Sequence, residues 1–112
     1  MSYWTQPAMK ERLDIKQQTQ AAQSIISKVA KFYGMTTDEV LGRCRRQELV
    51  KARFIAIYFI RNKTEFTLKT IGRMFKRDHA SIIHALKTIK QVKSLHYETD
   101  ITEDLKKLSN II

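Results

Sequence analysis

The stretch Thr67–Leu95, TLKTIGRMFKRDHASIIHALKTIKQVKSL, decides the fold that this sequence predicts. Its apolar side chains recur at spacings of three and four residues, which is the periodicity of an α-helix. They form two stripes: Leu68, Ile71 and Phe75, then Ile82, Leu86 and Ile89. The basic pair Lys76 and Arg77 interrupts the pattern between the stripes. We therefore predict a short helix, a tight basic turn and a longer helix.

Two further residues fit this arrangement. Asp78 stands just before the second helix, where its carboxylate can accept a backbone N–H and cap the helix. Gly72 has no side chain and lets the two helices approach closely. Such a pair is the sequence form of a helix-turn-helix, whose second helix can enter the major groove of DNA. Helix pairs that only build a core share this spacing, and the charge distribution separates the two interpretations.

The positive charge of the chain is concentrated around this stretch. The net charge is +10, and between Arg43 and Lys93 there are 14 lysine and arginine residues against 3 acidic ones. The remainder of the chain has a net charge of −1. A localised basic surface attracts polyanions and releases counterions when it binds DNA or RNA. A solvated basic surface without a partner is the alternative, but its coincidence with the predicted helix-turn-helix favours nucleic acid.

Length and composition limit the class of protein. The 112 residues suit one domain with a modest core. A single cysteine excludes a disulfide framework and a paired-cysteine metal site. No run of about 18 apolar residues is present to cross a membrane, and the beginning of the sequence lacks a secretory signal. We expect a soluble cytoplasmic protein that has no membrane partner.

The segment before the basic region is predicted to be helical. Ala8–Tyr33 favours helix, but a Gln-rich stretch in its middle leaves open one long helix or two. Its firm part is Ala22–Tyr33, with Gly34 as the C-cap. We divide the chain into an N-terminal extension, 1–23, which is partly helical, and a domain over 24–112.

Three more helices complete the prediction. Thr37 is expected to cap a short helix at Asp38–Gly42. Leu49–Lys63 contains the run FIAIYFI, whose residue types also suit a strand, but no partner strand or hairpin turn lies nearby. A helix that is apolar nearly all round belongs in the centre of a domain. Asp100 with Glu103 gives a capping-box-like start to the last helix.

The turn and the second helix also carry a recognisable signature. Residues Ile71–Ala85 read IGRMFKRDHASIIHA. They resemble I-G-x-x-F-G-G-R-D-H-T-T-V-L-H-A, the signature of the C-terminal DNA-binding domain of DnaA, the bacterial replication initiator. Upstream, Ile26–Tyr33, Thr37–Gly42 and Arg43–Tyr58 resemble a family helix, a short helix, and the basic loop with its following helix. The resemblance covers Ser24 to the C-terminus.

The fold class follows from both lines of reasoning. Periodicity predicts an all-α domain of six or seven helices that contains a helix-turn-helix. The resemblance implies the Trp-repressor-like or DnaA C-terminal type of helix-turn-helix. In that family the recognition helix reads the major groove of an asymmetric duplex site, and an arginine of the basic loop reaches the minor groove.

The resemblance implies DNA-contacting residues by position. Arg45 resembles the minor-groove arginine, and Arg53 resembles a second arginine of the family that contacts bases and phosphate. Arg61 corresponds to a lysine that contacts phosphate, and the backbone of Leu68 and Lys69 meets phosphate at the first helix. The reading residues of the signature correspond to Arg77, Asp78, His79, Ala80 and Ser81. From their charge and place we add Arg43, Arg46, Lys51 and Lys76 as phosphate contacts, with a solvated surface as the alternative.

Three departures from the family pattern alter the expected recognition. Lys76 stands where the family has two glycines, so the turn is one residue shorter and more basic. Ala80 and Ser81 replace two threonines, which removes a hydroxyl and a methyl from the reading face. Phe54 stands where the family often has a polar contact residue. The sequence has no G-x-x-x-x-G-K-[ST] phosphate loop, so we expect a stand-alone DNA-binding protein without the initiator's ATPase module.

The remaining reactive side chains do not indicate catalysis. His79 is either a packed structural histidine or a DNA contact, and the signature favours contact. His84 lies on the polar face, either near phosphate or in solvent. These two histidines do not share a helix face and have no third ligand, so we expect no metal and no cofactor. Cys44 lies between two arginines without an evident base, and we expect no enzyme activity.

Sequence-specific binding of double-stranded DNA is the leading hypothesis, in replication-origin binding, transcriptional regulation or competition with an initiator. One alternative is an adaptor that binds replication proteins, suggested by Trp4 and the Gln-rich segment. A second alternative is a non-specific binder of nucleic acid that uses charge alone. The family's module binds as a monomer, while the apolar C-terminus could build a weak dimer.

Overall fold

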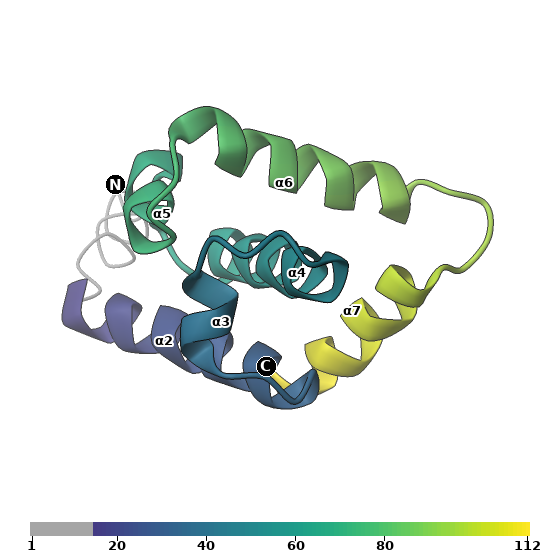
Figure 1. Cartoon of the computed structure of the whole chain (residues 1–112), viewed down its shortest axis with the longest axis horizontal. Helices are drawn as coiled ribbons and strands as arrows, with labels where there is room; N and C mark the ends of the chain where they lie inside the picture. The colour runs from purple at the N-terminus through teal and green to yellow at the C-terminus, as the bar shows by residue number, and fades with distance from the viewer. Residues whose placement is uncertain (1–14) are drawn as a thin grey trace, which may run out of the picture.

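A computed structural model describes residues 15–112 of the chain (Figure 1). Its helices are α2 (Ile15–Phe32), α3 (Thr37–Leu41), α4 (Gln47–Lys63), α5 (Leu68–Met74), α6 (His79–Lys93) and α7 (Asp100–Ile111). These described residues contain no strand, so the all-α prediction is confirmed. The predictions for Trp4 and for the beginning of the segment from Ala8 lie outside the described residues.

Helix α4 is the centre of the fold. Figure 1 shows α2 along one side of it and α6 along the other, with α5 at one end, and it contacts α2, α3, α5 and α6. Its buried apolar residues point to several sides of the helix: Leu49, Ala52, Ile55, Ala56, Ile57, Phe59 and Ile60. A helix with apolar residues on most of its circumference removes more surface from water when other helices surround it. The central position predicted for this segment is therefore confirmed.

Helix α2 settles the question left open for the first segment. It runs through the Gln-rich stretch as one helix, and its inner side packs Ile25, Ile26 and Val29 into the core. The boundary predicted between residues 23 and 24 lies inside this helix. Gly34 follows it with a φ of 68°, a left-handed conformation that glycine adopts without a steric cost. The predicted glycine cap is thus confirmed.

The start of α3 differs from the prediction by one residue. Thr36, and not Thr37, is the N-cap, and its hydroxyl accepts the backbone N–H of Glu39 at 3.1 Å. The Glu39 carboxylate accepts the backbone N–H of Thr36 at 2.8 Å, which completes a capping box. The sequence offers two adjacent threonines, and only Thr36 has a glutamate three residues later.

The start of α7 was also assigned to the wrong residues. Thr99 is the N-cap and forms a reciprocal pair of hydrogen bonds with Thr102. Asp100 is the first residue of the helix, and its carboxylate is bonded to Lys51 of α4. A tertiary partner thus replaces the local capping role predicted for Asp100 and Glu103. None of the helices in the described part of the chain has the length and apolarity that a membrane crossing requires.

Candidate nucleic-acid interface

The turn between α5 and α6 is built around a close backbone contact at Gly72. The Arg77 backbone N–H donates to the Gly72 carbonyl at 2.7 Å. A Cβ placed on Gly72 would lie 2.7 Å from the Arg77 carbonyl oxygen. The close approach predicted for this glycine is therefore confirmed, and it folds the turn directly onto α5. Lys76 completes the turn with a φ of 53°, in the left-handed region that costs a non-glycine residue energy.

The N-terminus of α6 is exposed and capped as predicted. Asp78 accepts the backbone N–H of Ser81 at 2.8 Å, and hydrogen bonds from Ser81 hold the pKa of the Asp78 carboxyl below its usual value. His79 and Ala80 are exposed in the first turn, and Ser81 is half-buried. The exposure of His79 rules out a role as a packed core histidine. These side chains stand on a surface that another molecule can reach.

The opposite side of α6 anchors this exposed helix in the core. Ile82, Ala85 and Ile89 are fully buried, and α6 packs along α4. On the outer side, His84 is exposed and its ring meets the Phe54 ring edge-to-face, with centroids 5.7 Å apart. Phe54 therefore supports α6 from α4, which gives it a packing role at a position where the resemblance implies a polar contact.

The basic loop 42–46 connects α3 to α4, and the buried side chain of Arg53 holds it from the protein interior. Only 3% of Arg53 is exposed. Its Nε donates to the Val40 carbonyl at 2.8 Å, and its Nη2 donates to the carbonyls of Cys44 at 3.1 Å and Glu39 at 3.4 Å. Burial and the nearby charge of Arg77 lower the pKa of Arg53. The guanidinium group therefore holds the end of α3 and the loop together.

The loop and the helix-turn-helix turn are also bonded to each other. Arg77 Nη2 donates to the Gly42 carbonyl at 2.8 Å, and Arg43 Nη2 donates to the Lys76 carbonyl at 3.3 Å. Each segment thus supplies an arginine to the backbone of the other. Burial and the charges of Arg43 and Arg45 lower the pKa of Arg77.

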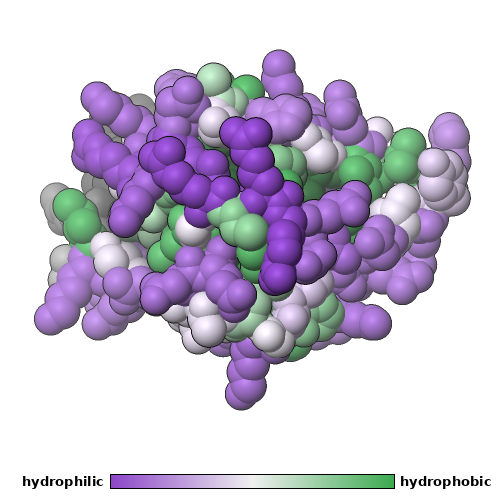
Figure 2. Space-filling model, in the orientation of Figure 1, coloured by the Kyte–Doolittle hydropathy of each residue, from purple (hydrophilic) through white to green (hydrophobic). Residues whose placement is uncertain are grey.

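The face that carries α3 and the loop is strongly hydrophilic. Figure 2 shows the most hydrophilic side chains gathered over its centre, where the α3–α4 connection passes in front of α4 in Figure 1. A surface hollow of about 580 Å³ lies between the loop, α4 and the beginning of α6. Its lining combines apolar residues of α4 with polar residues of the loop, the turn and α6: Arg45, Val50, Arg53, Phe54, Ile57, Arg77, Asp78, Ala80, Ser81 and His84.

Arg45 is the exposed arginine of the basic loop beside this hollow. No hydrogen bond or ion pair ties its side chain to another residue within 15–112. Arg46 is exposed at the N-cap of α4 and pairs with Glu48 at 3.4 Å. Since both partners are exposed, this ion pair contributes little to folding and leaves Arg46 reachable.

A second group of predicted residues lies at the junction of α4 and α5. The exposed Arg61 donates from Nη1 to the Phe66 carbonyl at 2.8 Å and braces the connection. Thr67 caps α5, so Leu68 and Lys69 are its first residues and Lys69 is exposed. The backbone N–H groups of a helix's first turn have no partner within the helix.

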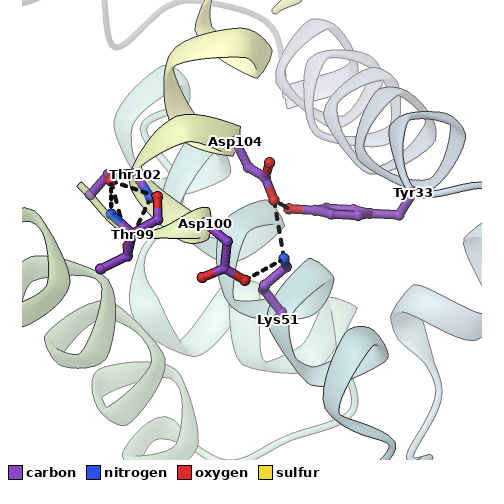
Figure 3. A network of polar contacts seen from close by, with 6 residues as sticks. All are labelled: Tyr33, Lys51, Thr99, Asp100, Thr102 and Asp104. Atoms are coloured by element: carbon purple, nitrogen blue, oxygen red, sulfur yellow. Dashed lines mark hydrogen bonds and ion pairs between the residues drawn. The ribbon is translucent and has the colours of Figure 1, made fainter.

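Lys51 lies in a different environment from the other basic residues. Figure 3 shows its ammonium group between two carboxylates of α7, at 3.0 Å from Asp100 and 3.1 Å from Asp104. Tyr33 donates its hydroxyl to Asp104 at 2.6 Å. Burial lowers the pKa of Lys51, but its bonds to the two carboxylates raise it by more. The structure thus gives Lys51 a role in joining α2, α4 and α7, and its predicted phosphate contact stays a prediction.

Sequence reasoning did not find the internal roles of Arg53 and Lys51. A signal for Arg53 was present, because it shares one side of α4 with Leu49, Ile57 and Ile60 and therefore stands at a core position. A cation at such a position needs buried acceptors. No comparable signal marks Lys51. Within residues 15–112, no three metal-ligand side chains gather.

Comparison with known proteins agrees with this architecture. The family model described as the bacterial dnaA protein helix-turn-helix matches residues 22–89. A chromosomal replication initiator protein DnaA of Chlorobaculum tepidum is 34% identical over 103 residues, which cover 90% of this chain and 20% of the relative. A DnaA 1 protein of Chlamydia pneumoniae is 39% identical over 67 residues, which cover 60% of this chain and 15% of the relative. The chain therefore spans a fifth or less of the length of these relatives.

Proposed function

Because the chain belongs to the bacterial DnaA helix-turn-helix family, whose module binds double-stranded DNA, we propose that it recognises a specific duplex sequence through two grooves. The beginning of α6 enters the major groove, and Arg45 enters the neighbouring minor groove. Such a protein acts at the nucleoid, in replication-origin binding or transcriptional regulation.

One observation carries this proposal. The exposed Arg45 and the exposed first turn of α6 border the same hollow, and the loop and turn that bear them are hydrogen-bonded to each other. A phosphate strand separates the minor groove from the major groove, so two reading elements on either side of one hollow suit a duplex whose strand crosses it. An arginine gains from the negative potential of a narrow minor groove.

The other residues divide into reading and positioning contacts. His79 and Ala80 can meet a thymine methyl, and Ser81 can bond a base edge. Asp78 can accept from a base amino group with the carboxylate oxygen that does not cap α6. The phosphate contacts come from exposed cations and helix-start amides that surround these readers: Arg43, Arg46, Arg61, Leu68, Lys69 and Lys76. Arg53 and Lys51 are engaged inside the protein, so their predicted DNA contacts stay predictions outside this set.

The direct experiment is a selection of bound duplexes from a random DNA pool at about 0.15 M salt. We expect one asymmetric motif, because a monomer presents one α6 and one basic loop. A palindromic motif would instead indicate a dimer. If no sequence is enriched and titration shows equal affinity for all duplexes, specific recognition is wrong and the chain binds DNA by charge alone.

Two variants separate the two grooves. Arg45→Ala should remove the preference at the minor-groove positions, and His79→Ala should relax different positions next to them. Each change is expected to cost about 1–3 kcal/mol of binding to the preferred site. Lys31→Ala is the control, since Lys31 is an exposed cation on α2, which lies across α4 from α6. If both variants weaken all duplexes equally, neither residue reads sequence.

A further inference from the structure

Arg45 projects from a backbone that is fixed on both sides. The carbonyl before it, on Cys44, accepts from Arg53 at 3.1 Å. The carbonyl after it, on Arg46, accepts two backbone N–H groups from the first turn of α4, those of Leu49 and Val50, each at 3.0 Å. The Arg45 side chain itself has no such restraint among the described residues. The loop thus presents an exposed side chain, unbonded among the described residues, on a fixed backbone.

The loop is fixed to the helix-turn-helix as well as to α4. Arg77 Nη2 holds the Gly42 carbonyl at the first residue of the loop, while the Arg77 backbone N–H holds the Gly72 carbonyl in α5. Arg77 also directly precedes Asp78, the cap of α6. One residue therefore connects α5, the start of α6 and the basic loop.

These connections are kept although they bring positive charges together. Arg77 is near enough to Arg53 to lower the pKa of its guanidinium group, and the charges of Arg43 and Arg45 lower the pKa of Arg77. The Nε of Arg77 is buried without an acceptor among the described residues. A loop held only for stability would not need cations here, because repulsion and desolvation both cost free energy. The rigid fork of a guanidinium group, however, fixes the direction of a carbonyl better than a lysine does.

Resting on the DNA-binding function proposed above, we propose that Arg53 and Arg77 are positioning residues that fix the basic loop relative to α6. Arg45 and the first turn of α6 then form one rigid reading unit. The distance along the duplex between the minor-groove and major-groove parts of the site is set by these two arginines. The arrival of phosphate also relieves the repulsion among the arginines, so binding and fixation support each other.

This role for Arg53 differs from the direct contact implied by the family resemblance. A contacting residue and a positioning residue both lose affinity when changed. They differ in what happens once the Arg45 side chain has been removed. If Arg53 acts only through Arg45, its change costs nothing further in the Arg45→Ala background, whereas an independent DNA contact costs the same in both backgrounds.

The test is a double-mutant cycle on the full chain with Arg45→Ala, Arg53→Lys and their combination. Affinity is measured by titration of the wild-type motif, and the motif of each variant is selected again from the random pool. We expect each single variant to lose about tenfold, and the double variant to lose no more than about twofold beyond Arg45→Ala. Arg53→Lys should lose the same motif positions as Arg45→Ala and keep the positions read by α6.

An additive result, with a loss of about a hundredfold in the double variant, would overturn the positioning role and make Arg53 a direct contact. A uniform weakening at all motif positions would also overturn it, because general loosening has no preferred position. Arg73→Lys is the matched control, since Arg73 is an exposed arginine of α5 outside the predicted contacts. It should bind as the wild type does.

Arg77→Lys gives the cycle a second, independent arm. Arg77 is only partly buried, so this variant keeps the proposal testable if Arg53→Lys fails to fold. Arg77→Lys should enrich motifs with more than one spacing between the minor-groove and major-groove halves, because the loop loses its bond to the turn. A wild-type chain without any preferred motif would refute the proposed function itself. A wild type with a motif but additive variants would refute only the positioning role.

Discussion

Gly72 offers the sharpest test of how the helix-turn-helix is held together. Replacing it with alanine has two opposed effects on stability. Alanine favours a helix over glycine by about 1 kcal/mol, so helix propensity alone predicts a more stable protein. The new Cβ, however, would lie 2.7 Å from the Arg77 carbonyl oxygen, which belongs to the backbone and cannot rotate away.

The structure lets the two effects be weighed. Forcing an extra methyl group into a close contact costs about 1–3 kcal/mol, and moving the turn also stretches the 2.7 Å bond from the Arg77 N–H to the Gly72 carbonyl. A bond of this kind contributes about 1 kcal/mol. After the propensity gain is subtracted, we expect Gly72→Ala to lower the free energy of unfolding by about 2 kcal/mol. For a domain of this size that lowers Tm by about 8–16 °C.

The measurement is thermal and urea unfolding followed by circular dichroism. Gly34→Ala is the control, because no atom lies within 4 Å of its added Cβ and its cost comes only from a φ of 68°. Gly34→Ala should lose about 1 kcal/mol of stability and keep the DNA affinity of the wild type. Gly72→Ala should lower both stability and DNA affinity. The added Cβ displaces Arg77, which is part of the turn and is hydrogen-bonded to the basic loop. A Gly72→Ala variant as stable as the wild type would show that the turn shifts freely, and the reasoning would be refuted.

Three further predictions concern single side chains. Lys76→Gly should raise the free energy of unfolding by about 0.5 kcal/mol, because it removes the strain of a left-handed backbone at a non-glycine residue. The variant should also bind DNA more weakly, and its affinity should fall less steeply with salt, by about 1 in the slope of log affinity against log salt concentration. Equal slopes for variant and wild type would exclude a phosphate contact. Asp104→Ala should lower the free energy of unfolding, measured in urea, by about 1–2 kcal/mol, because the Tyr33 hydroxyl loses its acceptor and Lys51 loses one of its two carboxylates. An unchanged urea midpoint would show that these contacts do not hold α7. The folded-state pKa of Asp78 lies below its unfolded value, so its contribution to stability is present above the unfolded pKa and is lost as pH falls through the folded pKa. Asp78→Asn should therefore flatten the loss of stability below about pH 4, and an unchanged acid profile would contradict this sign.

Local signals in the sequence predicted the helices well. The 3.6-residue periodicity placed α5 and α6, and the lack of a nearby partner strand or hairpin turn made α4 a helix. Asp78 and Gly34 marked a start and an end that the structure confirms. The errors at α3 and α7 were errors of choice between adjacent capping residues. At Thr36 and Thr37 the side chains are identical, so only the partner three residues later distinguishes them. A threonine alone therefore predicts that a helix begins, and the glutamate three residues later is needed to assign the first cap to Thr36.

The sequence by itself determined the all-α class, the helix-turn-helix, the basic middle of the chain and the family to which it belongs. Only the tertiary structure decided which cations face outward and which are bonded inside. Arg77 reaches a carbonyl 35 residues away, and Lys51 reaches a carboxylate 49 residues away. Every residue carries a backbone carbonyl, so no pattern in the sequence marks the one that a distant arginine will bind. The choice is made when the helices pack around α4, because packing alone brings those atoms within hydrogen-bonding distance.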